Sequence, residues 1–363
     1  MYAEAFFSKL LGLEAPFHLT EIRHLDDEEG QPLELVVEVD PSYRPLDSYG
    51  QPCTLHSYYE RRWRHLDVMQ YQCYIRCRVP RFRTSQGTFE TLAVPWAREE
   101  SRFTLLFEAL AMHWIEETHN VEAVARQLGV YAQRLWQVFN HYTSQALSAR
   151  ERGAASRVGL DETSRRKGHE YITLFVDMDT AEILDIQDGR DASTIERFAS
   201  SYAHAEYVEA ISMDMSPAFI KGVAVHLPEA TPTYDRFHVV RAIKRKVKEL
   251  ERCLTASKAD ALGYFRLWFA RLYQQSDPAE MAALLTFLID LAFEQGLKKI
   301  GRSLKAHFEG IVAYARTGLT NGLLEGINNK IQLIKRTARG YKDTETFKRM
   351  IYLSFGCLEL KFG

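Results

Sequence analysis

The stretch RVGLDETSRRKGHEYITLFVDMDTAEILDI, residues 157–186, contains three short runs of apolar and β-favouring residues. These runs cover residues 157–161, 171–176 and 182–186, and the tetrapeptide that starts at Asp177 supplies a turn between the last two. Short runs of this kind, bounded by turn residues, predict β-strands. Residues 157–186 therefore predict the beginning of a β-sheet.

Downstream of this stretch, helix and strand patterns alternate. A helix is expected near Ser193, because Ser193 and Glu196 have the spacing of a capping box. Two more strands are expected at residues 208–213 and 231–234, with a helix between them. A long basic helix then leads into almost uninterrupted helical periodicity over residues 241–320. The alternation predicts an α/β unit that carries a helical insertion.

The N-terminal part of the chain has a different pattern. Residues 30–95 alternate apolar and polar positions in short runs separated by Pro and Gly, which predicts a small β-rich module. From Ser101 onward, apolar residues recur at three- and four-residue spacing. That spacing predicts an amphipathic helix, with Ser101 available as its cap.

Residues 120–139 have the pattern of a helix-turn-helix. Two short helices around a turn at Gly129 would bury one shared apolar set. That set is Val124, Leu128, Leu135 and Val138. The second helix would present Gln133, Arg134 and Gln137 outward, toward DNA. An ordinary helical hairpin in a bundle fits the same pattern, although the sequence Ala-Arg-Gln-Leu-Gly-Val at 125–130 favours DNA binding.

A chain of 363 residues is long enough for two or three domains, and its patterns divide it into five segments. We expect a β-rich N-terminal DNA-binding module at 1–98, a helix-turn-helix domain at 99–152, the first part of the α/β core at 153–240, a helical insertion at 241–318, and the last part of the core at 319–363.

Composition indicates which classes of protein this chain can belong to and in which compartment of the cell it is expected. No apolar run approaches the roughly 20 residues that span a bilayer, so no membrane role is expected. The N-terminus lacks the features of a secretory signal, and we expect a cytoplasmic protein whose five cysteines are reduced. The net charge of −2 hides two basic clusters, at 241–252 and 330–349, which are expected to face phosphates.

Three acidic residues stand out. Asp161 and Asp214 lie in or after predicted strands, where a half-buried carboxylate costs free energy without a partner. Taken singly, each is better explained as a cap, but two neighbouring carboxylates repel each other unless metal ions neutralise them. Magnesium, which prefers oxygen ligands, suits such a pair.

The stretch TNGLLEGINNKIQLIKRTARGY, residues 320–341, places Glu325 early on a helix. The apolar face of that helix would consist of Leu324, Ile327, Ile331 and Ile334. A carboxylate at this position, backed by Asn328, Lys335 and Arg336, could complete a metal site while the cations face a phosphate.

Six pieces of sequence, in this order, resemble the catalytic domain of DDE transposases of the ISL3 type of bacterial insertion sequences (the IS204/IS1001/IS1096/IS1165-like group). They are GLDE at 159–162, RKGHEY at 166–171, GR at 189–190, SMDM at 212–215, DRFHVV at 235–240 and EGINNKIQLIKRTARG at 325–340. The resemblance covers residues 159–355, and RRWRHLD at 61–67 and VPWA at 94–97 extend it toward the N-terminus.

The resemblance implies a ribonuclease H-like mixed sheet flanked by helices. Asp161 would lie on the first strand, Asp214 on the fourth and Glu325 on a late helix. It implies that these residues are catalytic and hold two divalent metal ions, magnesium or manganese, for strand cleavage and strand transfer. The implied partners are double-stranded DNA, as terminal inverted repeats and target, and further copies of the chain in a homodimer or larger assembly, in a bacterial cytoplasm near the nucleoid.

Asp235, His238 and Asn328 are accessory candidates within these motifs. Asp235 and His238 stand one helical turn apart and could orient a phosphate or hold the catalytic carboxylates. A capping Asp and a packed helical His fit the same spacing. For the whole chain, two alternatives remain: a DNA-binding regulator that descends from a transposase, and a metal-dependent nuclease of the same fold.

The ISL3 group usually begins with a zinc-binding module, but residues 46–50 and 83–87 stand where its cysteine knuckles would be and lack cysteine. A replacement set has residue types suitable for zinc: Cys53, His56, Cys73 and Cys77. Because Cys73 and Cys77 also fit a strand with inward-facing residues, zinc is not expected and the module is described as a degenerate zinc ribbon.

The remaining candidates are basic or polar residues expected to contact DNA. For Arg61, Arg62 and Arg64, a strand with one solvated charged face is the alternative. The full set is Arg61, Arg62, Arg64, Gln133, Arg134, Gln137, Arg241, Lys244, Arg245, Lys330, Lys335, Arg336 and Arg339.

Overall fold

The computed structural model describes residues 3–26, 31–166, 170–251 and 256–362. The chain forms two compact units, residues 1–142 together with 360–363, and residues 143–359. Each unit contains its own five-stranded sheet.

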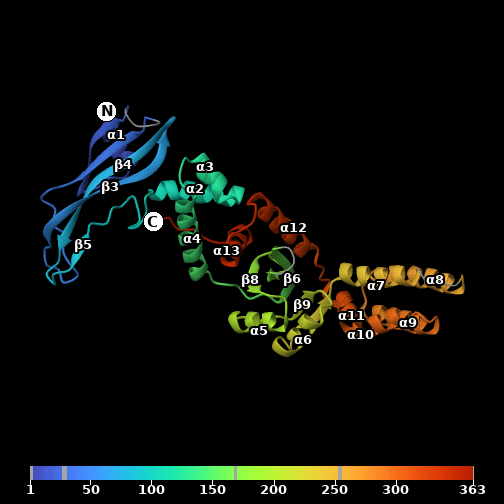
Figure 1. Ribbon diagram of the computed structural model, residues 1–363. Helices are drawn as coiled ribbons and strands as arrows, with labels where there is room; N and C mark the ends of the chain where they lie inside the picture. Colours follow the sequence, from blue (N-terminus) through green and yellow to red (C-terminus); the bar gives the residue numbers. More distant parts are fainter. Residues whose placement is uncertain (1–2, 27–30, 167–169, 252–255, 363) are drawn as a thin grey trace. The chain divides into compact units, whose positions relative to one another are not determined.

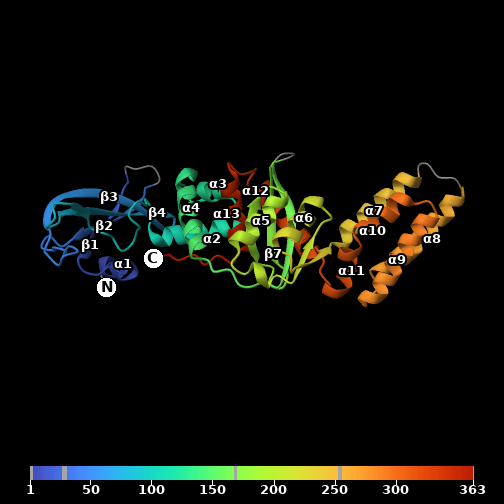
Figure 2. The same cartoon turned by 90° about the horizontal axis from the view of Figure 1, so that it is seen from below.

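The sheet of the first unit, at the blue end of the chain in Figure 1, has the order β1-β2-β4-β3, and β5 pairs with β4. Its strands are β1 (Phe17–His24), β2 (Leu33–Val39), β3 (Thr54–Val68), β4 (Tyr71–Arg83) and β5 (Phe89–Thr91). The pairing of β2 with β4 is parallel, and the others are antiparallel. Every second residue of β4 from Cys73 to Val79 is fully buried, as expected for a sheet with one covered face. The helix α1 (Ala3–Leu10) lies beside β1 (Figure 2), and the predicted β-rich module is confirmed.

Three helices follow this sheet: α2 (Leu105–Thr118), α3 (Val121–Gln127) and α4 (Ala132–Ala149). The predicted apolar set of the helix-turn-helix is buried, namely Val124, Leu128, Leu135 and Val138. Gly129 lies between α3 and α4 with φ +65°, in the left-handed region that glycine adopts at little cost. The predicted packing of these helices is therefore confirmed.

The sheet of the second unit has the order β10-β9-β6-β7-β8. Its strands are β6 (Arg157–Arg166), β7 (Glu170–Asp177), β8 (Ile183–Asp188), β9 (Ala210–Met213) and β10 (Thr231–Tyr234). The strands β6, β7 and β8 pair antiparallel, whereas β9 pairs parallel with both β6 and β10. The predicted mixed sheet is confirmed.

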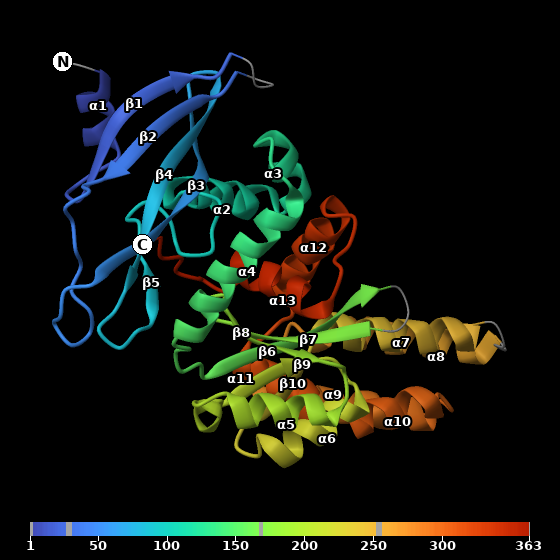
Figure 3. The same cartoon turned by 60° about the vertical axis from the view of Figure 1, so that its left-hand side comes forward.

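Helices cover both faces of this sheet (Figure 3). The helices α5 (Ala192–Ser201) and α6 (Pro217–His226) pack together on one face, and α12 (Gly322–Thr337) and α13 (Thr344–Phe355) pack on the other. A short 3-10 turn, η1 (Ala205–Tyr207), precedes β9. Apolar residues of α12 that the sequence predicts to be inward, such as Leu324 and Ile331, are fully buried.

The helical insertion extends from the β10 edge of the sheet (Figures 1 and 2). It consists of α7 (Arg236–Glu251), α8 (Ala256–Leu272), α9 (Pro278–Glu294), α10 (Lys298–Ala306) and α11 (Phe308–Thr317). Its buried residues, among them Phe265 and Leu285, belong to the same apolar core as the sheet. Among the helices of the described residues, none has the length and apolar character needed to cross a membrane.

Two predicted helix caps are wrong. Thr104, rather than Ser101, accepts a hydrogen bond from the first turn of α2, and Ser101 instead donates to the buried Glu108. Asp191, rather than Ser193, caps α5. In each case several neighbouring polar side chains have a suitable spacing, and only the backbone path decides which of them reaches the free N–H groups.

Candidate active site

Asp161 lies within β6, and Asp214 lies just beyond the end of the adjacent strand β9. In the parallel pairing of β6 with β9, Gly159 is opposite Ser212, and each aspartate comes two residues later. The two aspartates are close enough for the charge of Asp214 to act on Asp161. Asp214 directly follows the last residue of β9, and its Oδ1 accepts from the Ser216 N–H (2.8 Å).

The helix α12 lies along β6 through a series of polar contacts. Asn328 Nδ2 donates to Asp161 Oδ2 (2.6 Å), Gln332 Nε2 donates to Thr163 Oγ1 (2.7 Å), and Lys335 Nζ donates to the Ser164 carbonyl (2.7 Å). The helical residues are spaced by four and three, so they form one stripe. Glu325 precedes Asn328 by three residues and therefore continues this stripe toward the start of the helix.

Gly159 allows α12 to approach β6 closely. A Cβ at this position would lie 2.8 Å from Leu324 Cδ1 and would also collide with Met178 Sδ. Leu324 is fully buried and immediately precedes Glu325. The absence of a side chain at Gly159 thus helps to set the distance between the strand that carries Asp161 and the helix that carries Glu325.

One cavity of about 560 Å³ joins several of the predicted site residues. Its lining includes the following predicted residues: Asp161, Glu325, Asp235, His238 and Asn328. Asp214 does not line this cavity, although its charge acts on Asp161 and on His238. Glu325 is exposed, whereas Asp161 and Asp214 are half-buried.

The pKa is raised for two neighbouring acids of this region, Asp161 and Glu162. Burial is the main cause that raises the pKa of Asp161, and the charge of Asp214 adds to it, while the Glu162 N–H, His238 and Asn328 oppose it. The pKa of Glu162 is also raised, by burial first and then by Asp214 and Asp161. Glu162 was not among the predicted site residues, although it follows Asp161 directly in the GLDE motif.

Asp235 and His238 form a hydrogen-bonded pair at the start of α7. Asp235 Oδ2 accepts from the backbone N–H of His238 (3.1 Å) and lies 3.1 Å from its Nδ1. Burial would raise the pKa of Asp235, but the hydrogen bonds from His238 and Asn321 keep that pKa below its usual value. The bond to Asp235 raises the pKa of His238. Asp235 is thus a helix cap, and His238 is both packed against it and part of the cavity lining.

Asn321 is a site residue that the sequence did not single out. Its backbone N–H donates to Asp235 Oδ1 (3.0 Å), its Oδ1 accepts from Ser212 Oγ, and its side chain lines the cavity. It is 5% exposed, and its Nδ2 has no hydrogen-bond partner among the described residues. Its partners lie 109 and 86 residues away in the chain, so no local pattern could have revealed this role.

The chemistry of this site fits a hard divalent cation. Asp161, Asp214 and Glu325 offer carboxylate oxygens, the ligands that Mg²⁺ prefers. Burial is the main cause that raises the pKa of Asp161, and a bound cation would stabilise the ionised form of this carboxylate. Within the part of the chain that the structure describes, no three His, Cys, Asp or Glu side chains are already gathered closely enough to hold a metal ion.

Most predicted DNA-contact residues are exposed. In the helix-turn-helix these are Gln133, Arg134 and Gln137, which all lie on α4. In the second unit the exposed members are Arg241, Lys244, Arg245, Lys330, Arg336 and Arg339. Lys335 differs, because it is half-buried and its ammonium group donates to the Ser164 carbonyl.

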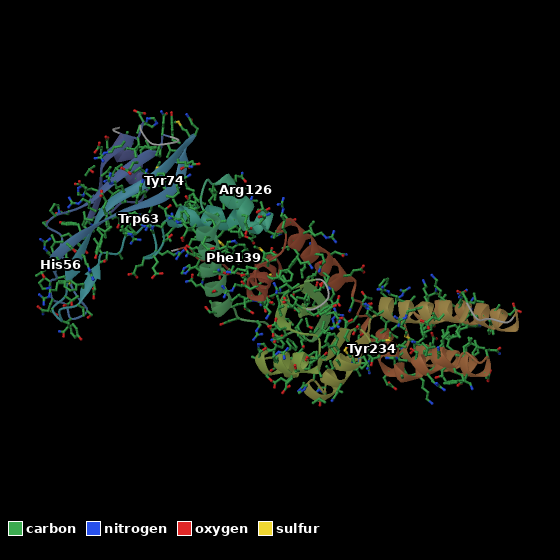
Figure 4. All side chains as sticks on the ribbon, viewed as in Figure 1. His56, Trp63, Tyr74, Arg126, Phe139 and Tyr234 are labelled. Atoms are coloured by element: carbon green, nitrogen blue, oxygen red, sulfur yellow. The ribbon has the colours of Figure 1, made fainter. Side chains whose placement is uncertain are left out.

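The arginines of β3 are engaged within the first unit. Arg61 donates to the carbonyls of Glu99 and Ser101. Arg62 pairs with Glu34, and its guanidinium group lies over the ring of Tyr74 (Figure 4). Arg64 is 4% exposed and pairs with Asp67. The prediction that Arg64 contacts DNA is therefore corrected, because its guanidinium group is buried and already bonded.

The candidate zinc ligands of the N-terminal module lie in different surroundings. Cys73 and Cys77 are fully buried in an apolar core, and burial raises the pKa of each thiol to about 12. The ring of His56 packs against Phe89. Cys53, Cys73, Cys77 and Cys357 are free, and Cys253 lies outside the described residues.

Three family models match the sequence, in an order that follows the structure. Residues 49–84 match the model described as a zinc-finger of transposase IS204/IS1001/IS1096/IS1165. Residues 92–143 match the helix-turn-helix domain of transposase family ISL3. Residues 158–262 and 264–351 match the ISL3 model described as transposase, which covers more than half of the chain.

Two curated relatives are similar over nearly the whole chain. The transposase for insertion sequence element IS1001 of Bordetella parapertussis is 26% identical over 401 aligned residues, which cover 91% of this chain and 93% of the relative. The transposase for insertion sequence element IS1557 of Mycobacterium tuberculosis is 22% identical over 427 aligned residues, which cover 96% of this chain and 94% of the relative.

Proposed function

This chain belongs to the ISL3 family of transposases, and on that premise we propose that it cuts and joins DNA strands with Asp161, Asp214 and Glu325 as its catalytic acids. The observation that carries this proposal is the placement of the three acids. In the register of β6 and β9 each aspartate follows the last opposed pair, Gly159 and Ser212, by two residues, and the contacts of α12 with β6 bring Glu325 to the same cavity as Asp161.

The three carboxylates are further proposed to hold two divalent ions, magnesium or manganese. Such ions, when bound, lower the pKa of an attacking water or 3'-hydroxyl group and stabilise the leaving oxygen of an in-line displacement at phosphorus. The chain's own residues aim the carboxylates. Asn328 Nδ2 and the Glu162 N–H hold the two oxygens of Asp161, at 2.6 and 2.9 Å. Ligands that are held in place before DNA binds need less reorganisation during the reaction.

Asp235 and His238 are proposed to orient a phosphate of the DNA. The bond to Asp235 fixes the imidazole at the cavity and raises its pKa, which favours the cationic form. A cation at this place attracts a phosphate oxygen and offsets part of the negative charge of the catalytic acids. Asn321 also lines this cavity, and its Nδ2 has no hydrogen-bond partner among the described residues, so it is a second candidate donor to that phosphate.

The remaining segments are proposed to bind the ends of the element. The module at 1–98 and the helix-turn-helix at 99–152 would recognise the terminal inverted repeats. The segments 153–240 and 319–363 would form the catalytic core around the insertion at 241–318. Because two ends must be brought together, we propose a homodimer or larger assembly on DNA.

Isosteric variants test the catalytic acids. Linear DNA that carries both flanks of the gene is incubated with a target plasmid and magnesium, and nicked and joined products are measured. Asp161→Asn, Asp214→Asn and Glu325→Gln should each lower the cleavage rate about 1,000-fold or more, because each removes charge from a site that supplies several kcal/mol of stabilisation. DNA binding should remain.

The control is Asp260→Asn, which changes an exposed acid of α8 and should cleave normally. Normal cleavage by any of the three site variants would remove that residue from the proposed triad. DNA binding by the unmodified protein without cleavage would favour a regulator, and cleavage without joining would favour a nuclease.

The DNA-binding surface of α12 can be tested through salt dependence. Arg336→Gln should reduce the slope of log binding constant against log salt by about one, because one phosphate contact is lost. Lys335→Gln should change the slope less, since Lys335 already donates to Ser164. Arg302→Gln, at an exposed position of α10, is the control. An unchanged slope for Arg336→Gln would assign that arginine to structure.

A further inference from the structure

A second cavity, of about 630 Å³, lies between α7 and α8, next to the cavity of the catalytic acids. Arg236 and Val240 line both cavities, so the two cavities are neighbours within the second unit. One wall is aliphatic and comes from α7. The other wall is aromatic and consists of Phe265 and Phe269 of α8 and Tyr273, which directly follows α8.

The rim of this cavity is mainly basic. Arg236, Lys244 and Lys248 of α7 are exposed there, and no ion pair involves them within the described part of the chain. Arg266 of α8 is also at the rim and pairs with Glu251. The rim therefore has four cations and one carboxylate, so it attracts an anionic ligand.

Tyr273 supplies a second, independent observation. Its side chain lines the cavity and is 8% exposed, and its hydroxyl group has no hydrogen-bond partner among the described residues. The guanidinium group of Arg236 lies 5.5 Å from the centre of its ring. A buried hydroxyl group without a partner costs about 1–3 kcal/mol, which a ligand with a polar atom at this depth would relieve.

We propose that this cavity receives one unstacked base of the DNA strand beside the catalytic cavity. The base would lie against the aromatic wall, its polar edge would reach the hydroxyl group of Tyr273, and its neighbouring phosphates would meet Arg236 and Lys244. The volume is within the range of about 300–1,000 Å³ that is usual for small-ligand sites. The orientation of the strand rests on the proposed function, since it assumes that DNA enters the cavity of the catalytic acids.

The energetic balance favours a base that is already unpaired. Removing a base from a regular duplex costs a few kcal/mol, and stacking on an aromatic side chain returns about 1–3 kcal/mol per base. A distorted or partly opened DNA end should therefore occupy the cavity more readily than a regular duplex. This gives the cavity a measurable preference that phosphate contacts alone would not produce.

The test compares two fluorescently labelled duplexes of the same sequence, one fully paired and one with a single extra unpaired adenine. Affinities are measured by fluorescence anisotropy without divalent metal. The unmodified protein should bind the probe with the unpaired adenine about tenfold more tightly, as stacking of that size implies. Ala270→Phe, which adds a ring at the exposed mouth of the cavity, should abolish the preference.

Two more variants complete the test. Ala259→Phe adds the same ring at an exposed position of α8 that does not line the cavity, and it should keep the full preference. Tyr273→Phe removes only the hydroxyl group and should reduce the preference about two- to tenfold, the effect of one hydrogen bond. If Ala270→Phe does not fold, the Tyr273→Phe variant alone tests whether the cavity receives the base.

Equal affinity of the unmodified protein for both probes would overturn the proposal, and so would a preference that Ala270→Phe and Tyr273→Phe both retain. If Ala270→Phe changes the sedimentation coefficient while the preference persists, the cavity is a contact between copies of the chain. Because no metal is present, none of these results bears on the catalytic acids, whose test is cleavage.

Discussion

Two pairs of acids, one in each unit, have different surroundings. In the first unit, Glu34 is 2% exposed between Arg62 and Arg76, and Glu108 is 0% exposed against Arg98. In the second unit, Asp161 and Glu162 have no arginine as close as these among the described residues, and burial together with neighbouring carboxylates raises the pKa of each. The first pair is satisfied by cations of the chain, whereas the ionised form of the second pair would be stabilised by an external cation.

This difference teaches how to separate a structural acid from a functional one. Burial alone does not do so, because Glu34 and Glu108 are more deeply buried than Asp161. The composition of the surroundings does, since a folded chain gains nothing from like charges placed together. Asp235 is intermediate: it is 3% exposed and satisfied by His238 and Asn321, yet it lines the catalytic cavity.

The largest effect is expected at Glu108. Glu108→Ala removes the acceptor of Arg98, Ser101 and Tyr142 from a fully buried position. Breaking such a pair leaves buried polar groups unsatisfied and should lower the free energy of unfolding by about 3–5 kcal/mol. Urea unfolding of the whole chain measures it. Glu108→Gln keeps the shape and should lose less, and a loss below about 1 kcal/mol for Glu108→Ala would undo the contrast.

A smaller effect of opposite sign is expected at Asp161. Its pKa in the folded protein is raised above the ordinary value, so ionisation costs stability at neutral pH, and the cost disappears as pH falls through the raised pKa. In metal-free protein at pH 7, Asp161→Asn should therefore raise the free energy of unfolding, by an amount on the order of 1 kcal/mol. Magnesium should raise the melting temperature of the unmodified protein more than that of the variant. A variant less stable than the parent would show that Asp161 has no uncompensated charge.

The smallest effect is a pH dependence from His238. Its pKa is raised by Asp235, so the stabilisation is complete below pH 6.5 and is lost as pH rises through the folded-state pKa. The difference in unfolding free energy between the parent and His238→Gln should shrink from pH 6 to pH 8.5 in metal-free protein. Since the His238 side chain is 36% exposed, the change should stay below about 1 kcal/mol. A difference independent of pH would mean that the pair contributes only packing.

The patterns that were read correctly from the sequence are local. The period of two in β4, the apolar stripe of α12 and the shared apolar set of α3 and α4 all depend on residues within a few positions of one another. The strand run before Asp214 is also local, and Asp214 directly follows β9; the run expected to end at Asp161 instead continues in β6 to Arg166. These features follow from which face of an element is buried, and burial of a face leaves a periodic trace in the sequence.

The features that the sequence did not predict depend on distant segments. Arg64 is buried because the chain around residues 102–104 pairs with β3, with hydrogen bonds from the Arg64 N–H to Arg102 and from the Thr104 N–H to Arg64. Asn321 matters because Ser212 and Asp235 meet it from other elements. The caps of α2 and α5 were misplaced because competing hydroxyl and carboxyl groups lie within three residues of the true caps.

The first and last helices of the insertion both lie next to β10. A single residue, Asp235, separates β10 from the first of these helices, and the last helix packs against β10, where the hydroxyl groups of Thr233 and Thr317 are 3.0 Å apart. The two ends of the insertion are thus held close together by their contacts with β10. Extra residues at the distal end of the insertion should therefore cost little chain entropy, while Asp161 and Glu325 keep their spacing.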